Sequence, residues 1–341
     1  MIRLQPALFA KLDTHDGLTT ALQQAIALEH ATIPTYLYSL YSIKPGDNVA
    51  IAGLLRSVVL EEMLHMSLAC NILNAVGGAP IIDDPKFIPT YPGRLPGSVE
   101  TELIVPLARF SLDLVANVFM VIEEPEDPLN FPVRSLELAT AAPLTIGSFY
   151  RAIEAQIKAQ GEAIFVGDPT RQVTHAFPAT ELFAVTDVNS ALKAIDLIVE
   201  QGEGTTRSPL DLQHELAHYY RFAEVYHGRA LVPDPAIPEG FSYSGPAIPF
   251  DPAGVWPAIQ NPKTATYPTG SRARNACLNF NYGYTSLLKS LHATFNGQPG
   301  QLAAAIGLME SLKEQAMNMM EIELGDGTNA GPSFEYQPVN S

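Results

Sequence analysis

Two stretches of this chain repeat the pattern Glu-x-x-His within segments of helical periodicity. Glu62 and His65 form the first pair, and Glu215 and His218 form the second. Residues three apart lie on the same face of an α-helix, so each pair directs one carboxylate and one imidazole at a common point. Two such helices, with one inward Glu from each of two further helices, supply the ligands of a carboxylate-bridged di-iron or di-manganese site in a four-helix bundle. The pattern therefore predicts two more helices and two more carboxylates.

The apolar spacing predicts four helices that could position these groups. They are expected at about 19–41, 49–76, 146–160 and 208–228. The second stops at Gly77-Gly78, a helix C-terminal signal. The fourth opens with Ser208, Pro209 and Asp211, which is typical of a helix N-terminus. Pro34 lies inside the first and predicts a kink there.

The remaining segments indicate a crossover and a C-terminal extension. A long crossover with a short helix at about 111–123 links the second and third helices, and a further helix is expected near 188–201. Residues 233–268 carry nine prolines, which favours extended coil, and two more helices are expected at about 279–295 and 300–320. We predict an all-α fold, with a four-helix bundle in residues 1–230 and a proline-rich wrap and C-terminal helices packed on it in residues 231–341.

Two candidate ligands lie within apolar helical stripes. Glu29 is flanked at helical spacing by Ile26 and Ile33, and a carboxylate there is costly to bury unless it is paired or binds a metal. Glu62 has a similar setting. Its neighbour Glu61 could also reach His65 at four-residue spacing, so the spacing leaves open which of the two acids is the ligand.

The last carboxylate is assigned to the helix at 146–160. Glu154 lies near its middle, whereas the rivals Glu123 and Glu200 lie at helix ends. Glu203 lies in a Gly-rich turn and is expected to be a loop or pocket residue. The predicted metal ligands are Glu29, Glu62, His65, Glu154, Glu215 and His218.

The second pair also satisfies a zinc-protease pattern. His214, Glu215 and His218 read H-E-x-x-H, in which both histidines bind zinc and the Glu is the base. The extended form of that pattern needs Gly and His where this chain has Arg221 and Glu224, and Glu239 is the remaining distant candidate. Asp211 could orient His218 or could cap the helix. A zinc hydrolase is therefore kept as a minor alternative.

Composition excludes several classes of function. A formal net charge of −16 and a pI near 4.8 argue against nucleic acid and anionic membranes as partners, because neither would be attracted to an acidic surface. Two cysteines, Cys70 and Cys277, are too few for a disulfide framework. The chain has no leader pattern and no apolar run of about 18 residues. We expect a cytoplasmic protein.

The motifs resemble those of a known family. The segments that carry the likeness are Ala27–Pro34, Glu61–Met66, Thr145–Gly147 with Phe149–Tyr150, Gln201–Thr205, Glu215–Phe222 and Phe280–Asn281 with Tyr284, Leu287 and Leu288. Together they are similar to the ferritin-like family typified by iminophenyl-pyruvate dimer synthases, over nearly the whole chain. That family includes enzymes that oxidatively couple two tryptophan-derived imines in bisindole pigment pathways, and characterised members include much longer polypeptides. The resemblance implies a ferritin-like fold and a role in secondary metabolism.

The ligand types predict the chemistry. Oxygen and nitrogen donors suit Fe(II) or Mn(II), and two reduced irons can together take up O₂. Tyr36, Tyr150 and Tyr219 are candidates to hydrogen-bond a metal ligand. We predict an O₂-dependent di-iron oxidoreductase, with manganese as the alternative to iron. Its substrate is expected to be a small molecule of the amino-acid-derived kind that the resemblance implies. The alternative is a non-catalytic metal-binding or iron-handling protein. The extension would obstruct a storage cage, so a monomer or small homo-oligomer is expected.

Overall fold

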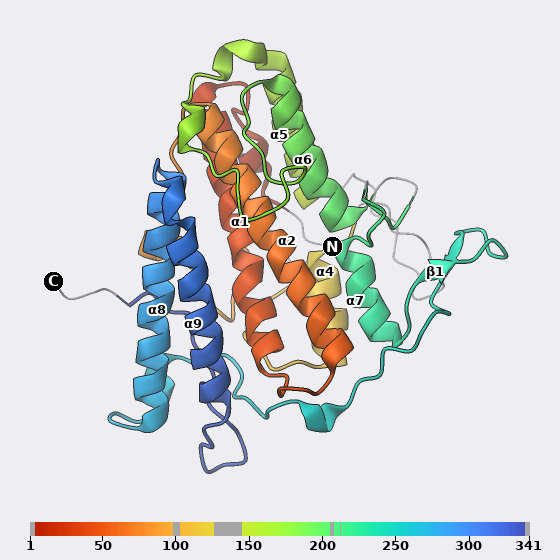
Figure 1. Cartoon of the computed structure of the whole chain (residues 1–341), viewed down its shortest axis with the longest axis vertical. Coiled ribbons are helices and arrows are strands. Elements are labelled where there is room, and N and C mark those ends of the chain that lie inside the picture. Colours follow the sequence, from red (N-terminus) through yellow and green to blue (C-terminus); the bar gives the residue numbers. More distant parts are fainter. Residues whose placement is uncertain (1–3, 98–102, 126–144, 205–207, 212, 338–341) are drawn as a thin grey trace.

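Two long helices form the centre of the molecule. The computed structural model describes residues 4–97, 103–125, 145–204, 208–211 and 213–337. Helix α1 (His15–Tyr41) and helix α2 (Val49–Ala75) pack side by side along their length, as Figure 1 shows in red and orange. The side chain of Thr14 caps α1 by accepting a hydrogen bond from the amide of Gly17 (3.0 Å), and α1 continues through Pro34. The short connection at residues 42–48 makes the two helices antiparallel.

The other two columns of the bundle are each built from two shorter helical pieces. The third column begins with α3 (Leu112–Leu114), a π-helical turn (Val115–Phe119) and α4 (Met120–Ile122), and resumes at α5 (Ile146–Gln160). The fourth column consists of α6 (Val188–Glu203) followed by α7 (His218–His227). Helix α5 packs on α1 and α6, while α7 packs on α2 and on the π-helical turn. The pair α5–α6 therefore covers one half of α1 and α2, and α4–α7 covers the other half (Figure 1).

Both columns are interrupted at the same level of the bundle. Ile122 and Glu123 at the end of α4, Ile146 at the start of α5 and Gly202 near the end of α6 all line one cavity. The break leaves helix ends facing the middle of α1 and α2. These ends meet the carboxylates of the two long helices.

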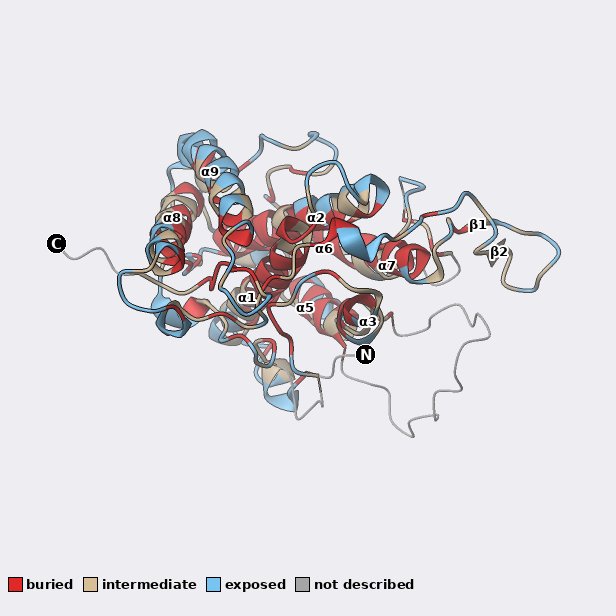
Figure 2. Cartoon of the chain, turned by 90° about the horizontal axis from the view of Figure 1, so that it is seen from below, coloured by how far each residue is buried: buried red, intermediate tan, exposed pale blue. Residues whose placement is uncertain are grey.

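The core runs without interruption from the bundle into the C-terminal helices. Figure 2 shows the buried surfaces of α1, α2, α5 and α6 turned toward one another, with the exposed surfaces on the outside. Buried apolar side chains of all these helices form one cluster, which also includes Phe280 and Leu288 from the C-terminal part. Burial of this continuous apolar surface is the main stabilising contribution to the arrangement.

The segment after α7 is extended and rich in proline. It contains one short antiparallel ribbon, in which β1 (Val232–Pro233) pairs with β2 (Phe241–Ser242). Two helices follow, α8 (Arg272–Phe295) and α9 (Leu302–Met320), which pack on each other and against α2 and α1 respectively. Short 3-10 turns lie at Pro6–Phe9, Pro85–Phe87, Gly161–Ile164, Pro169–Arg171, Pro252–Gly254, Thr264–Thr266 and Pro299–Gln301.

The predicted all-α four-helix fold is confirmed, but two predicted helix starts are wrong. Helix α8 begins at Arg272 rather than near 279, because Ser271 caps it there. The sequence predicts a helix from 208 to 228, but α7 begins only at His218. The carboxylate of Asp211 accepts hydrogen bonds from the amides of Gln213 and Glu215 (both 2.9 Å) and so folds the preceding residues into a turn. A bridge between Leu210 and Leu216 closes this turn, which excludes a continuous helix. The division of the chain near residue 230 stays a prediction.

In the part of the chain that the structure describes, no helix combines the length and apolar character needed to cross a membrane.

Candidate metal centre

Two groups of buried side chains could each hold a metal ion, and they share one residue. Glu29, Glu62 and His65 form one group, and Glu62, Glu123 and His218 form the other. Within each group the ligand atoms lie within 4.8 Å of one another. Since Glu62 belongs to both groups, it could be shared by two ions. Each ion would then have one histidine and one further carboxylate of its own.

The helix geometry explains how these residues meet. Glu29 lies near the middle of α1, and Glu62 and His65 lie one turn apart on the facing side of α2. Glu123 directly follows α4, and His218 is the first residue of α7. The interruptions of the third and fourth columns therefore bring helix ends, rather than helix middles, to the centre.

Both histidines direct Nδ1 at carboxylates. Nδ1 of His218 lies 2.9 Å from Glu62 and 3.5 Å from Glu123, and Nδ1 of His65 lies 3.6 Å from Glu29. The two imidazole rings stack with centroids 5.4 Å apart. The donor set is thus three carboxylates and two imidazoles around a shared Glu62.

One atom tests whether a metal fits this set. Nδ1 of His218 is buried and makes no hydrogen bond of acceptable geometry with the described residues, although two carboxylates lie near it. A buried polar atom without a hydrogen bond is costly, and a metal ion between the imidazole and the carboxylates would satisfy it. The nitrogen and oxygen donors are those that Fe(II) and Mn(II) accept. The residues present therefore fit a metal centre.

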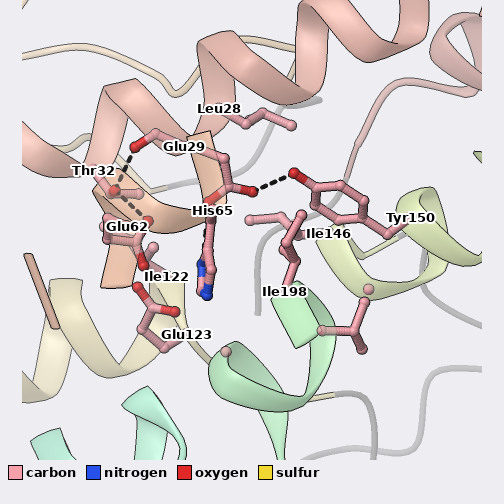
Figure 3. Close-up of a pocket in the computed structure, with 13 residues that line it drawn as sticks. Leu28, Glu29, Thr32, Glu62, His65, Ile122, Glu123, Ile146, Tyr150 and Ile198 are labelled. Carbon is pink, nitrogen blue, oxygen red and sulfur yellow. Dashed lines mark hydrogen bonds and ion pairs between the residues drawn. The ribbon is translucent and has the colours of Figure 1, made fainter. Parts of the chain in front are cut away.

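Neighbouring side chains hold the ligands in place (Figure 3). The hydroxyl of Tyr150 donates to Glu29 (2.6 Å), and that of Thr32 donates to Glu62 (2.8 Å). The hydroxyl of Tyr36 donates to Glu123. Nε2 of His65 lies 2.9 Å from the amide oxygen of Gln201, the partner that leaves Nδ1 free to face the centre. Each candidate ligand therefore has an orienting contact.

The structure distinguishes the roles of Glu61 and Glu62, which the spacing leaves open. Glu62 lies in both candidate groups, whereas Glu61 contacts the far side of His218, with its carboxylate 3.0 Å from Nε2. Arg221 donates to the other oxygen of Glu61 (2.6 Å). Glu61 is therefore placed to orient His218, and it belongs to neither candidate group.

The pKa values reflect the concentration of negative charge. Burial, followed by the charge of Glu123, raises the pKa of Glu62 to about 7. Burial would lower the pKa of His218, but its contacts with Glu123, Glu61 and Glu62 raise it well above its usual value. Burial would raise the pKa of Glu61, yet His218 and Arg221 lower it to about 2. A bound cation would relieve the repulsion among the three central carboxylates.

A small cavity lies directly against the candidate ligands (Figure 3). Its volume is about 40 Å³, and Glu29, Glu62, His65, Glu123 and Tyr150 form its polar wall. Thr32 adds a hydroxyl, and the rest of the wall is aliphatic or glycine: Leu28, Ile122, Ile146, Gly147, Ile198, Val199 and Gly202. The centre is thus enclosed in a largely apolar shell.

Glu154, the carboxylate predicted on the helix at 146–160, is not brought to this group. It lies one turn beyond Tyr150 on α5, where its carboxylate pairs with Arg151 (2.9 Å) and Lys158 (2.5 Å). Helix α5 starts at the cavity and runs away from it, so only its first turn can reach the centre. Glu123, which the sequence leaves as a rival, occupies the expected place instead.

Glu215 is also outside the group. Because the helix begins at His218, Glu215 lies in the preceding turn, with its side chain 68% exposed and 3.4 Å from Arg221. His214 is exposed and has a left-handed backbone (φ 65°), so it does not share a helix face with His218. The H-E-x-x-H geometry of a zinc protease is therefore not formed. Asp211 shapes the turn and does not contact His218 through any bond found among the described residues.

The remaining rivals lie elsewhere. Glu200 is on α6 but belongs to neither candidate group, and residue 203 ends the same helix. The rings of Tyr219 and Tyr220 pack edge to face, with centroids 5.1 Å apart, in a small cluster beside β2. Of the predicted ligands, the structure groups Glu29, Glu62, His65 and His218. Their role as ligands stays a prediction.

The geometry can be compared with known proteins. A family model described as ferritin-like matches residues 22–227, more than half of the chain. The chain belongs to the ferritin-like family. The matched residues include all members of both candidate metal groups. The predicted family resemblance is thereby confirmed.

Two individual proteins are similar to this ferritin-like chain. A dichlorochromopyrrolate synthase from Lentzea aerocolonigenes is 27% identical over 387 aligned positions, covering 95% of this chain but 36% of the synthase. The chain therefore spans about a third of that relative's length. A crystal structure of a ferritin-like protein from Caulobacter vibrioides superposes with a TM-score of 0.62 at 24% identity, covering 94% of this chain and 97% of the other. The second match shows a shared fold.

Proposed function

We propose that the protein is a non-haem di-iron oxidoreductase that uses O₂ to oxidise a small, amino-acid-derived molecule. The observation that carries this proposal is the position of Glu62 in both candidate groups. A shared carboxylate with one histidine on each side is the arrangement expected for two ions held close together. Glu29, Glu62, His65, Glu123 and His218 would hold them.

The bound ions would supply the electrons for reduction of O₂. The chain itself has three other tasks. Tyr36, Tyr150 and Thr32 hold the carboxylates in fixed orientations through hydrogen bonds. The aliphatic part of the wall gives the centre a largely apolar surrounding, which strengthens electrostatic interactions there. Gln201 and Glu61 set which nitrogen of each imidazole faces the ions.

The cavity at the centre restricts how a substrate can approach. A volume of about 40 Å³ has room for roughly three waters, which is too little for an amino-acid derivative. The substrate must therefore reach the centre from the side where the columns are interrupted. Gly202 lies at that side, and a Cβ added there would meet no atom of the described residues within 4 Å. We propose that the substrate approaches past this glycine.

The synthase from Lentzea aerocolonigenes supports an enzymatic role. It aligns with nearly the whole of this chain, and its name describes a biosynthetic enzyme. The substrate class proposed here rests on that similarity and on the family resemblance. The alignment covers only about a third of the relative. We therefore propose only the substrate class for this protein and do not propose that it uses the same substrate as the synthase.

Oxygen uptake tests the proposal. The iron-loaded protein is incubated in an oxygen electrode with a panel of amino acids and the imines derived from them. We expect at least one compound to accelerate O₂ uptake above the rate of the metal-loaded protein alone, and His218→Ala to abolish that acceleration. If no compound accelerates uptake, the amino-acid-derived substrate is wrong.

The second candidate is an iron-handling protein without an organic substrate. The same donor set would bind and oxidise ferrous iron, so metal binding alone does not separate the two functions. Sizing the protein in solution does. We expect a monomer or small oligomer for an enzyme, whereas a shell-sized assembly would favour iron storage.

A further inference from the structure

A second concavity lies on another face of the α1–α2 pair. Figure 1 shows α8 and α9 beside α1, across the two long helices from α4 and α7. Between the pair α1–α2 and the pair α8–α9 is a groove of about 380 Å³. Its wall is almost entirely apolar and comes from all four helices; it includes Ile33, Leu37, Met63, Met66, Phe280, Leu288, Phe295 and Met309. This volume falls in the usual range of small-molecule sites, unlike the cavity at the metal centre.

The groove continues into a second compartment. A neighbouring cavity of about 480 Å³ shares Leu37, Tyr41, Leu60, Met63 and Met309 with the first, so the two compartments adjoin. Along α1 the shared groove extends from His30 to beyond Tyr41, which at 1.5 Å per residue is about 17 Å or more. The groove is therefore elongated along α1, and its length fits an extended chain better than a compact ring system.

The two compartments differ in charge. The inner compartment is the groove of about 380 Å³, and the outer compartment is the neighbouring cavity of about 480 Å³. The inner compartment is lined by a single charged residue, Glu310, at the shared wall. The outer one is lined by Lys44, Arg56 and Lys313 together with Asp47 and Glu310. This local excess of positive charge contrasts with a chain whose formal net charge is −16. An anionic group would be attracted to the outer compartment.

Two groups in the outer compartment have no hydrogen-bond or ion-pair partner among the described residues. Lys44 donates to the carbonyl of Ala253 (2.7 Å), and Lys313 lies 3.8 Å from Glu310. By contrast, neither Arg56 nor the hydroxyl of Tyr41 has a hydrogen bond or ion pair to any residue that the structure describes. A guanidinium and a phenol are both good donors to a carboxylate.

The apolar rim of the groove is open to water. Leu60 is 46% exposed and Ile306 is 38% exposed, which makes them two of the larger apolar side chains left uncovered on the described surface. Both line the inner compartment. Three methionines beside them, Met63, Met66 and Met309, give the wall the adaptable surface that suits a flexible ligand.

We propose that this groove binds a free long-chain fatty acid. The acyl chain lies in the inner compartment between α1–α2 and α8–α9, and the carboxylate lies in the outer compartment against Arg56 and Tyr41. This site is separate from the metal centre, and the proposal does not depend on the oxidoreductase function.

Displacement of a fluorescent fatty acid tests the site. The purified full chain is titrated with 11-(dansylamino)undecanoic acid, and the bound probe is then displaced with hexadecanoate or hexadecanol. We expect a saturable blue shift of the dansyl emission. We expect hexadecanoate to displace the probe at least about tenfold better than hexadecanol, because only the acid gains the charged contact.

Two variants assign the binding to the groove. Arg56→Glu should weaken the binding of hexadecanoate by at least about tenfold and leave the binding of hexadecanol unchanged. The exposed control Lys193→Glu on α6 should change the affinity for neither ligand. Met63→Trp should fill the groove and abolish the binding of both ligands. Should Met63→Trp fail to fold, the exposed Leu60→Trp replaces it, with Ile81→Trp as its control. Circular dichroism establishes that each variant is folded.

Three outcomes would overturn the proposal. The first is the absence of saturable binding, and the second is displacement that does not depend on the carboxylate or on Arg56. The third is a dimer in solution that Leu60→Arg dissociates, since the groove would then be covered by a second copy of the chain. Each readout is independent of metal content and of oxygen uptake.

Discussion

Glu61 and Glu62, adjacent in sequence, contact opposite nitrogens of the same imidazole. The carboxylate of Glu62 lies 2.9 Å from Nδ1 of His218, and that of Glu61 lies 3.0 Å from Nε2. Arg221 holds Glu61 in turn through a contact of 2.6 Å. The relationship makes Glu62 the candidate ligand and Glu61 the group that keeps a proton on Nε2, so that Nδ1 is free for a metal.

Removing Glu61 should therefore weaken metal binding without removing a ligand. We expect Glu61→Ala to lower the affinity for the metal by about 10–100-fold, and Glu61→Gln to restore part of the loss because an amide oxygen still accepts from Nε2. Competition with a chromophoric chelator measures the affinity. Glu215→Gln, on an exposed side chain nearby, is the control and should bind as the wild type does. Equal affinity in Glu61→Ala would contradict this role.

Filling the open side of the cavity should separate metal binding from turnover. At Gly202 an added Cβ would meet no atom of the described residues within 4 Å, and Gly202→Leu also replaces a helix-weakening residue in α6. We expect it to retain its metal and lose substrate-dependent O₂ uptake. Gly307→Leu in α9 is matched, since it too meets nothing within 4 Å, and it should keep full activity. Full substrate-dependent O₂ uptake in metal-loaded Gly202→Leu would show that the substrate does not approach past this glycine.

Acidification should destabilise the protein through His30. Burial lowers the pKa of His30 to about 3, so the unfolded chain binds a proton below about pH 6.5 that the folded chain does not. Stability is therefore lost as the pH falls from 6.5 toward 3, by up to about 1.4 kcal/mol per pH unit from this residue. Urea unfolding of the metal-free protein at pH 6 and pH 5 measures the slope. His30→Gln should show a shallower slope, and an unchanged slope would contradict the assignment.

The C-terminal tail should depend on one buried amide. The side chain of Asn281 donates to Thr264 (3.0 Å) and Ser333 (2.9 Å) and accepts from the amide of Glu335 (3.1 Å), which joins α8 to the residues after α9. We expect Asn281→Ala to lower the free energy of unfolding by about 2–3 kcal/mol, since several buried polar groups lose their partner. Asn279→Ala, on the exposed side of α8, should change it by less than about 0.5 kcal/mol. Denaturant titration compares the two.

Much of the fold is readable from the sequence because its signals are local. The helix at 146–160 is bounded by a Thr145 cap and Gly161, and α5 has these bounds in the structure. Apolar periodicity likewise predicts α1, α2 and α6 to within a few residues at each end. Glu29, Glu62, His65 and His218 were predictable as a group, because a carboxylate or imidazole in an apolar stripe needs a partner.

The errors come from one non-local feature, the interruption of both outer columns at the same level. The sequence favours Glu154 because metal ligands are expected at mid-helix, and it discounts Glu123 at a helix end. In a broken column the helix end is what faces the centre. The signal was available in the run Glu123-Glu124-Pro125, where acids directly follow an apolar helix that proline must end. Similarly, Asp211 reads as a capping residue, but it closes a turn before the helix starts.

Metal content compared across four variants tests the central claim most directly. Each protein is expressed with added iron and its metal content is measured by elemental analysis. The wild type is compared with a first pair of single variants, Glu123→Ala and His218→Ala, and with a second pair, Glu154→Ala and Glu215→Ala. We predict about two irons per chain in the wild type, a sharp loss in the first pair and no change in the second pair. Wild-type protein that binds no metal, or loss in Glu154→Ala with full occupancy in Glu123→Ala, would contradict the account.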